Sequence, residues 1–461
     1  MNDLLKYVFG QVEAKRLSLD AALTILKSAR QQGSLDSVAV QAAAPAHAKG
    51  EVETLLLRPT WQEAQLPAAE PVSYGAHWVV LCEVGGDAEA ALKAALPQAR
   101  CLHLSAEGAD LSTRYGGYAA QLLAYLQAMF SEKPSGWVRV QLVVPASGEG
   151  ALLAGLGGML KSARQESPKL VIQVLGVEPS LGGEALAQCV SAEAQAFEED
   201  VRYRAATREV MRLEEVREDA EQAQALVPTP WKRGGVYLIS GGAGGLGLIF
   251  GKAIATAVSD VTLVLTGRSV LGAEKLQQLR QLEALGARGV PAGGRDGCRG
   301  GGRMCAGGGP GTRWAHGRDP HGRGAARQLP CEEDGERVAC GARTEGGGVL
   351  ALDAATRDQP LEVFVSFSSA AGMLGNVGQT DYAAANAFLD AHAALRAAAV
   401  QAGECSGRTL SMAWPLWAEG GCGWMRRRGI DCGAAQGWCR WGRRRGCRRW
   451  RVRCRWRGRL G

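Results

Sequence analysis

Residues 236–247, VYLISGGAGGLG, place an apolar strand pattern directly before a glycine-rich turn that opens a helix. In such a turn the glycines allow a sharp change of direction, a close approach of the backbone to a pyrophosphate, and close helix packing. The amides at the N-terminus of the helix favour the negative charge of phosphate. We therefore predict that this turn binds a dinucleotide cofactor through Gly241, Gly242, Gly244, Gly245, Leu246 and Gly247.

A basic residue follows the next expected strand, at 261–265. This strand is followed by Thr266-Gly-Arg268-Ser269, at the position where an NAD-binding protein carries an acid for the ribose 2′-hydroxyl. An arginine suits the 2′-phosphate of NADPH instead. We therefore predict NADPH as the cofactor, with Arg268 and Ser269 among its ligands. The alternative is that Arg268 is an exposed strand-end residue that binds nothing.

The pattern on both sides of the turn is that of an α/β protein. Short apolar strands alternate with helical stretches, which favours parallel sheets. We predict two Rossmann-like units, one over residues 51–230 and one over 231–420. The expected strands lie at 54–57, 78–82, 138–144, 170–174, 236–239, 261–265, 363–367 and 409–413, and the expected helices at 118–130, 184–197, 273–285 and 382–399. Ordered structure is expected to resume at 349–356.

Three further segments differ in composition. Residues 1–50 hold a helical pattern at 17–30 and then an Ala-rich linker. Residues 291–345 contain 15 Gly and nine Arg, with Leu329 and Val338 as the only Leu or Val, so burial cannot offset the entropy of folding and we expect disorder. Residues 421–461 form a tail rich in Arg, Trp and Cys.

The net charge of +7 comes from that tail. Residues 421–461 hold 14 Arg, one acid and no Lys, so the remaining 420 residues sum to −6 and give no reason to expect a phosphate-binding surface over the whole body. Nine of the 13 Cys fall within 291–345 and 421–461. The four scattered others suit a reducing compartment, and the sequence shows no targeting or transmembrane segment. We expect a cytoplasmic protein without membrane contact.

A second motif lies in residues 367–386, FSSAAGMLGNVGQTDYAAAN. Ser369 ends a strand, Tyr382 starts an Ala-rich helix, and Asn386 lies one turn further on the same face. A tyrosine hydroxyl can donate a proton to a carbonyl oxygen as hydride reaches the carbon, a serine can orient that oxygen, and an asparagine can hold a relay water. Singly, each has an ordinary structural explanation. Together with the glycine turn, we predict them as catalytic residues.

These motifs, with Ala413-Trp-Pro-Leu-Trp417, resemble the ketoreductase domain of modular polyketide synthases, in the short-chain dehydrogenase/reductase superfamily. Residues 51–230, with LLLRPTW at 55–61 and GLGGMLKSARQESPKL at 155–170, resemble that domain's structural half, which has no cofactor site. The resemblance covers about 51–290 and 346–421. LSLDAALTILKSAR at 17–30 resembles the helical linkers of synthases whose acyltransferase is a separate protein.

The resemblance implies NADPH-dependent reduction of a β-ketoacyl thioester on an acyl carrier protein to a β-hydroxyacyl thioester. Tyr382 would be the acid, Ser369 the orienting hydroxyl and Asn386 the relay residue. The partners would be the carrier protein and other domains of a multifunctional enzyme in antibiotic biosynthesis. No metal ion is expected at the site.

One residue of the family pattern is absent. The family places a Lys about two dozen residues before the serine, where it binds the nicotinamide ribose and lowers the tyrosine pKa. Here that region centres on Glu345, and the last lysine of the chain is Lys275. The nearest base, Arg343, is a poor substitute because its planar fork differs from an ammonium. The alternative is therefore an inactive ketoreductase remnant.

The two anomalous segments leave other hypotheses open. Each begins abruptly and fills with Arg, Gly, Cys and Trp, which suggests out-of-frame translation of GC-rich coding DNA. The Arg-Trp alternation at 438–459 could instead bind nucleic acid by phosphate contacts and stacking. The Cys spacings contain no Cys-x-x-Cys, and they fit no compact zinc finger.

Overall fold

The computed structural model describes residues 56–67, 72–84, 88–132, 134–204, 207–216, 231–240, 242, 245–266, 273–292, 312–316 and 335–415. The chain divides into two compact units, Met1–Leu55 and Leu56–Gly461, and all described residues belong to the second. The predicted linker at 1–50 and the tail at 421–461 lie outside them.

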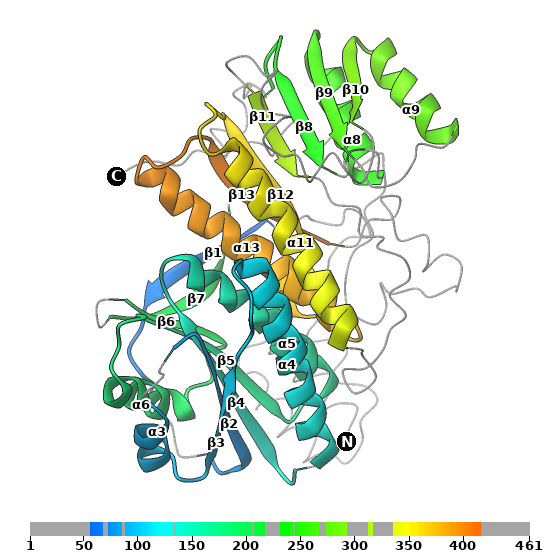
Figure 1. Cartoon of the computed structure of the whole chain (residues 1–461). Coiled ribbons are helices and arrows are strands. Elements are labelled where there is room, and N and C mark those ends of the chain that lie inside the picture. Colours follow the sequence, from blue (N-terminus) through cyan, green and yellow to red (C-terminus); the bar gives the residue numbers. More distant parts are fainter. Residues whose placement is uncertain are drawn as a thin grey trace, which may run out of the picture. The chain divides into compact units, whose positions relative to one another are not determined.

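The first half of this unit is a seven-stranded sheet with strand order β1-β7-β6-β5-β4-β2-β3 (Figure 1). The strands in the order β3, β2, β4, β5 and β6 pair in parallel with their neighbours, as predicted. The β6–β7 and β7–β1 pairs are antiparallel. Only two residues separate Arg204 from Thr207, which is too short for the crossover that a parallel pair requires. The prediction of a parallel sheet therefore holds for the centre of this sheet and is wrong at one edge.

The elements of the first half are β1 (Leu57–Glu63), β2 (Tyr74–Cys82), α3 (Glu89–Ala95), β3 (Ala99–Leu104), α4 (Leu111–Glu132), β4 (Trp137–Pro145), the 3-10 helix η1 (Glu149–Leu156), α5 (Gly157–Glu166), β5 (Leu170–Val177), α6 (Gly183–Ala192), η2 (Glu193–Gln195), β6 (Asp200–Arg204) and β7 (Thr207–Glu215).

The second half is a six-stranded sheet of order β10-β9-β8-β11-β12-β13, and every pair in it is parallel. Its elements are β8 (Val236–Ser240), α8 (Gly245–Ala257), β9 (Val261–Thr266), α9 (Ala273–Ala284), β10 (Ala287–Ala292), β11 (Thr312–His316), α11 (Gly335–Thr356), β12 (Val363–Ser369), α12 (Ala370–Leu374), α13 (Thr380–Gln401) and β13 (Arg408–Trp414). The predicted α/β class with two Rossmann-like units is confirmed.

Disorder throughout 291–345 was a wrong expectation. Residues 312–316 form β11, which pairs with β8 on one side and β12 on the other, and α11 begins at Gly335. The expectation weighed only side-chain burial. A strand between two others satisfies its backbone hydrogen bonds on both edges, so a segment poor in aliphatic residues can still be held there.

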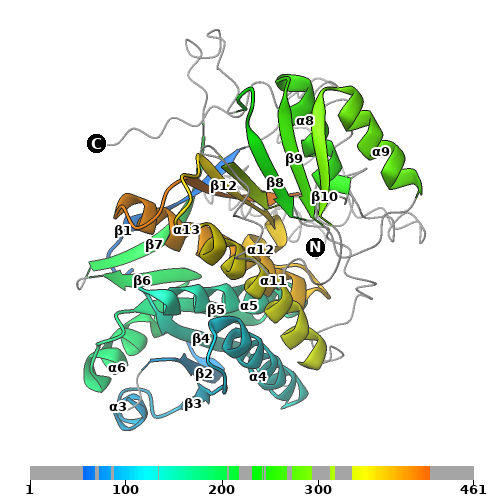
Figure 2. The ribbon, with the colours of Figure 1, turned by 45° about the horizontal axis from the view of Figure 1, so that its top comes forward.

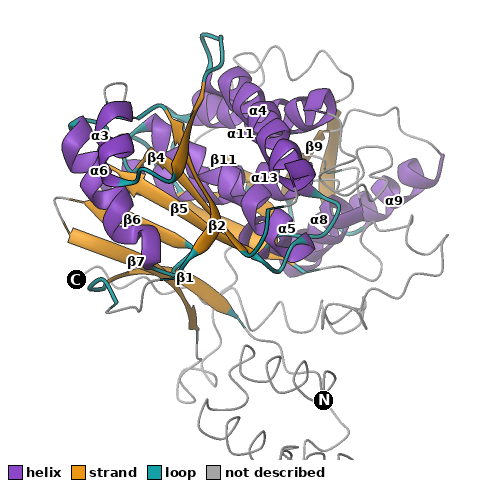
Figure 3. Cartoon of the chain, turned by 90° about the horizontal axis from the view of Figure 1, so that it is seen from below, coloured by secondary structure: helices purple, strands orange, loops and turns teal. Residues whose placement is uncertain are grey.

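The central strands of the first sheet are mostly apolar and buried on both faces, as helices on both faces require. On one face lie α3 and α6, which pack side by side (Figure 3). On the other face, α4 and α5 meet α11 and α13 of the second half (Figure 2).

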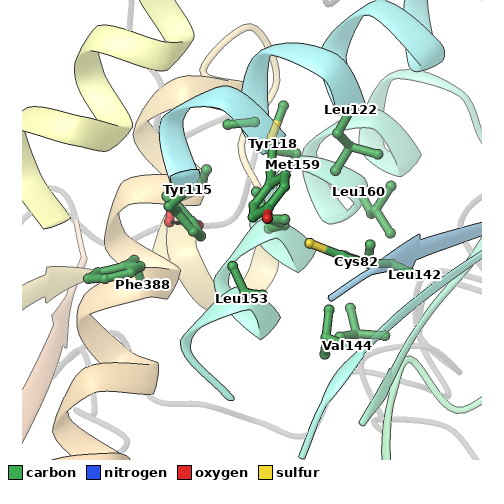
Figure 4. Close-up of a cluster of buried hydrophobic side chains, with 14 of the residues drawn as sticks. Cys82, Tyr115, Tyr118, Leu122, Leu142, Val144, Leu153, Met159, Leu160 and Phe388 are labelled. Atoms are coloured by element: carbon green, nitrogen blue, oxygen red, sulfur yellow. Dashed lines mark hydrogen bonds between the residues drawn. The ribbon is translucent and has the colours of Figure 1, made fainter. Parts of the chain in front are cut away.

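A single cluster of buried side chains joins the two halves. It contains Leu122, Leu142 and Leu160 from the first half and Phe364 and Phe388 from the second. The rings of Tyr115 in α4 and Phe388 in α13 meet edge to face, with their centroids 4.7 Å apart (Figure 4). The helix that carries the predicted catalytic tyrosine in its first turn is therefore packed directly on the half that has no glycine turn.

Candidate functional site

The glycine turn follows β8 and leads directly into α8. Gly242 is buried, and its amide donates to the carbonyl of Ile239 (3.0 Å). A Cβ at this position would lie 2.7 Å from that carbonyl oxygen and 2.8 Å from Leu265 Cδ2. Only glycine fits there, and this is the close backbone path that a dinucleotide turn requires.

The helix start has the predicted form. Gly245, Leu246 and Gly247 form the first turn of α8, and Leu246 and Gly247 are buried. The amides of this turn can meet a phosphate, so the described residues fit a dinucleotide. Gly241, Gly244, Arg268 and Ser269 lie outside the described residues.

Ser369 is the last residue of β12, as predicted, and it caps α12. Its Oγ accepts a hydrogen bond from the Ala371 amide (3.2 Å). Because the cap uses Oγ as an acceptor, its hydroxyl proton can be donated to another group. The neighbouring Ser368 is buried, and its Oγ donates to the carbonyl of Asn386 (3.3 Å). The end of β12 is therefore hydrogen-bonded to α13 beside Asn386.

Tyr382 and Asn386 lie one turn apart at the start of α13. The Tyr382 amide donates to Asp381 Oδ1 (2.7 Å), and Asn386 Nδ2 donates to the Tyr382 carbonyl (2.7 Å). Asn386 is buried, and its Oδ1 has no hydrogen-bond partner within the described part of the chain. A buried amide oxygen of this kind is suited to accept a hydrogen bond from a water or a ligand.

The helices on either side of the site are in close contact. A Cβ on Gly372 of α12 would lie 2.6 Å from the Ala387 amide nitrogen and 3.0 Å from Asn386 Cβ. The structure therefore brings together the end of β12, α12 and the Tyr382–Asn386 turn. A hydroxyl that orients a carbonyl, a proton donor and an amide are the groups that reduction of a carbonyl requires.

Sequence reasoning missed a set of residues beside this site. Ser162, Gln165 and Glu166 of α5 hydrogen-bond the loop that joins α12 to α13. Burial raises the pKa of Glu166, partly offset by the bond it accepts from the Gly378 amide. The spacing i, i+3, i+4 places the three on one helix face. A polar face is usually exposed to solvent, so this signal did not identify them.

No described helix is long and apolar enough to cross a membrane. The described residues also contain no group of three or more His, Cys, Asp or Glu that could hold a metal ion.

The fold and the glycine turn define a dinucleotide-binding α/β protein, and comparison with known proteins specifies its family. Residues 332–419 match the family model described as KR domain. A ketoreductase domain from the bacillaene assembly line is 30% identical, with a TM-score of 0.73, over 86% of this chain and 93% of that one. An N-terminal ketoreductase from the macrolactin assembly line shares the fold, with a TM-score of 0.60 at 19% identity, over 94% of this chain and 92% of that one.

Two synthases of Bacillus subtilis (strain 168) are also similar. The polyketide synthase PksN is 34% identical over 395 residues, and PksL is 33% identical over 375 residues. These regions are 81% and 80% of this chain but only 7% and 8% of the two relatives. The chain belongs to the ketoreductase domains of polyketide synthases, a family of oxidoreductases that bind a nicotinamide cofactor.

Proposed function

We propose that this chain reduces a β-ketoacyl thioester, carried on an acyl carrier protein, to a β-hydroxyacyl thioester with NADPH. The observation that supports the proposal is the junction of β12, α12 and α13, where Ser369 caps α12, Ser368 bonds the Asn386 carbonyl, and Asn386 bonds the Tyr382 carbonyl. The relatives are synthases or domains of them, which supports a carrier-bound substrate and other synthase domains as partners.

Each residue has a distinct task in this proposal. Ser369 donates its hydroxyl proton to the substrate carbonyl and fixes its direction. Tyr382 donates a proton to the same oxygen as it gains negative charge, and Asn386 Oδ1 holds the water that replaces that proton. NADPH supplies the hydride when bound. The turn at 241–247 would hold its pyrophosphate, and Arg268 with Ser269 its 2′-phosphate.

The test is NADPH oxidation by the purified chain with a β-ketoacyl thioester surrogate, compared with Tyr382→Phe. We expect turnover that Tyr382→Phe abolishes and Ser369→Ala lowers about 100-fold or more, because each removes a group that acts on the carbonyl oxygen. Arg268→Ala should weaken the binding of NADPH more than the binding of NADH. Wild-type turnover no higher than that of Tyr382→Phe would refute the proposal for the chain as it stands.

A second candidate, an inactive ketoreductase domain that keeps its fold, is favoured by the missing lysine. Glu345→Lys separates the two. The family pattern has a Lys at about this position, and a cation beside a tyrosine favours loss of its proton, so a reductase that lacks only this group should gain at least about tenfold in kcat. If both the wild type and Glu345→Lys fail to exceed Tyr382→Phe, the inactive domain is the correct assignment.

A further inference from the structure

The segment between the two predicted catalytic hydroxyls is held by the other half of the protein. Residues 370–381 form α12, then a loop, then the first residues of α13. Three side chains of α5 contact it. Asn376 N donates to Ser162 Oγ (3.1 Å), Gln165 Nε2 donates to the carbonyls of Leu374 (2.7 Å) and Gly375 (3.2 Å), and Gly378 N donates to Glu166 Oε1 (2.8 Å).

The loop also lies directly on the α5 backbone. Gly375 has a φ of +77°, and a Cβ on it would lie 2.4 Å from Lys161 C and 2.5 Å from Ser162 N. One turn earlier on α5, a Cβ on Gly158 would lie 2.6 Å from the carbonyl oxygen of Ala383. The same helix therefore contacts both the loop and the backbone beside Tyr382.

Helix α5 is itself fixed within the first half. Lys161 forms an ion pair with Asp200 of β6 (2.8 Å), and both side chains are largely buried. Ser162 Oγ donates to the Gly158 carbonyl (2.9 Å), which orients its lone pairs for the Asn376 amide. A helix anchored in this way does not move with the loop, so its contacts set where the loop lies.

We propose that α5 positions the catalytic pair, with Gln165 and Glu166 as positioning residues that set the separation of Ser369 and Tyr382. The inference rests on the proposed function. The hydrogen bonds described above join both residues to the loop backbone. They hold the backbone between the two predicted catalytic hydroxyls, and a displacement of about 1 Å at a reacting centre can lower the rate about 100-fold.

The test uses four variants of the full chain, in the wild-type or Glu345→Lys background, whichever turns over faster. Gln165→Ala and Glu166→Ala remove the contacts. Glu166→Gln keeps an oxygen that accepts from Gly378. Arg164→Ala is the matched control, because Arg164 lies on the same helix and pairs with Glu199 inside the first half. Thermal unfolding, kcat, KM for NADPH, and amide exchange of peptides covering 374–379 are measured for each.

We expect Gln165→Ala and Glu166→Ala to lower kcat about tenfold or more and to speed exchange at 374–379, with KM for NADPH and the unfolding midpoint near wild type. Glu166→Gln and Arg164→Ala should match the wild type. A lower kcat with an unchanged KM for NADPH distinguishes a positioning role from a general loss of structure. If Glu166→Ala does not fold, Gln165→Ala alone tests the inference, by the same measurements of unfolding, kcat, KM and amide exchange.

Two results overturn the inference. One is wild-type kcat in both Gln165→Ala and Glu166→Ala, and the other is unchanged exchange at 374–379. If neither the wild type nor Glu345→Lys turns over substrate, the proposed function is refuted independently of this inference. The exchange measurement still decides whether α5 fixes the loop, because it needs no substrate.

Discussion

Arg396 is a buried charge in the second half, and removing it tests how much its contacts stabilise that half. It lies on α13 at 2% exposure, and its guanidinium is 4.5 Å from the ring centre of Phe364. Its nitrogens donate to four oxygens: Asp353 Oδ1 (2.7 Å), the carbonyls of Ser406 (2.8 Å) and Gly407 (3.1 Å), and Thr409 Oγ1 (2.6 Å). One side chain thus connects α11, α13 and the start of β13.

Arg396→Met keeps much of the side-chain volume and removes every donor. Within the described part of the chain, Asp353 then keeps only the contact to His392 Nε2 at 3.3 Å. Removing one partner of a buried ion pair costs about 3–5 kcal/mol of unfolding free energy, because the other charge is left without compensation. We expect a loss in this range at neutral pH.

The loss should depend on pH in a defined direction. Burial alone raises the pKa of Asp353, but the hydrogen bonds and charges of His392 and Arg396 outweigh it, so the pKa is lowered in the folded protein. A lowered pKa contributes stability above the unfolded value of about 3.9, and this stability is lost as the pH falls through the folded value. In Arg396→Met the pKa of the Asp353 carboxyl rises, because its cationic partner is gone. Acid then neutralises the unpaired charge, so the difference in unfolding free energy between wild type and variant becomes smaller towards pH 4.

The assay is urea unfolding followed by tryptophan fluorescence at pH 7.5 and pH 4.5. Lys232→Met is the control. It removes a surface ion pair with Glu362 (2.8 Å) in the same half, and such a pair contributes about 1 kcal/mol or less. A deficit for Arg396→Met below about 1 kcal/mol would show that the buried pair does not stabilise this half. A deficit equal at both pH values would contradict the assignment of the loss to an unpaired Asp353 carboxylate.

Two further substitutions test the contact between the halves. Gly158→Ala should cost about 1–3 kcal/mol and lower turnover, since its Cβ would lie 2.6 Å from the Ala383 carbonyl oxygen. Gly182→Ala, whose Cβ meets nothing within 4 Å, is the control, and equal midpoints in urea would contradict the prediction. Tyr115→Phe loses the bond from its hydroxyl to the Ala384 carbonyl (2.9 Å) and should cost about 1 kcal/mol. A midpoint at or above wild type would show that this bond does not stabilise the contact.

Local patterns in the sequence predicted the elements that carry strong hydrophobic signals. The strand expected at 78–82 is part of β2, and the helix expected at 382–399 is α13 with two more residues at each end. The strand end at Ser369 was also placed correctly. These features depend on residues near in sequence, whose periodicity reports which face is buried.

What the sequence could not show depends on distant residues. The strand expected at 54–57, of which 54 and 55 lie outside the described residues, overlaps β1 at Leu57–Glu63 only at Leu57. The position of β1 is set by pairing with β7, from Leu57 with Glu215 to Glu63 with Glu209. Glu166 meets Gly378 across 212 positions, and nothing near either residue indicates the other. The helical stretch expected at 184–197 ends at Ala192 and continues as η2, whose Glu193 carboxylate pairs with Arg208. Tertiary partners determined each of these outcomes.

Strand β11 has a consequence for how the second half holds together. On one side of it lie β8 and the glycine turn, and on the other lie β12 and Ser369. The backbone ladder between β8 and β12 thus runs through five residues, TRWAH. The ring cluster of Phe250, Phe367 and Trp414 joins α8 to β12 and β13 as well. Withdrawal of β11 would leave β8 and β12 each with an unpaired edge, so this short strand is what makes the six strands one continuous sheet.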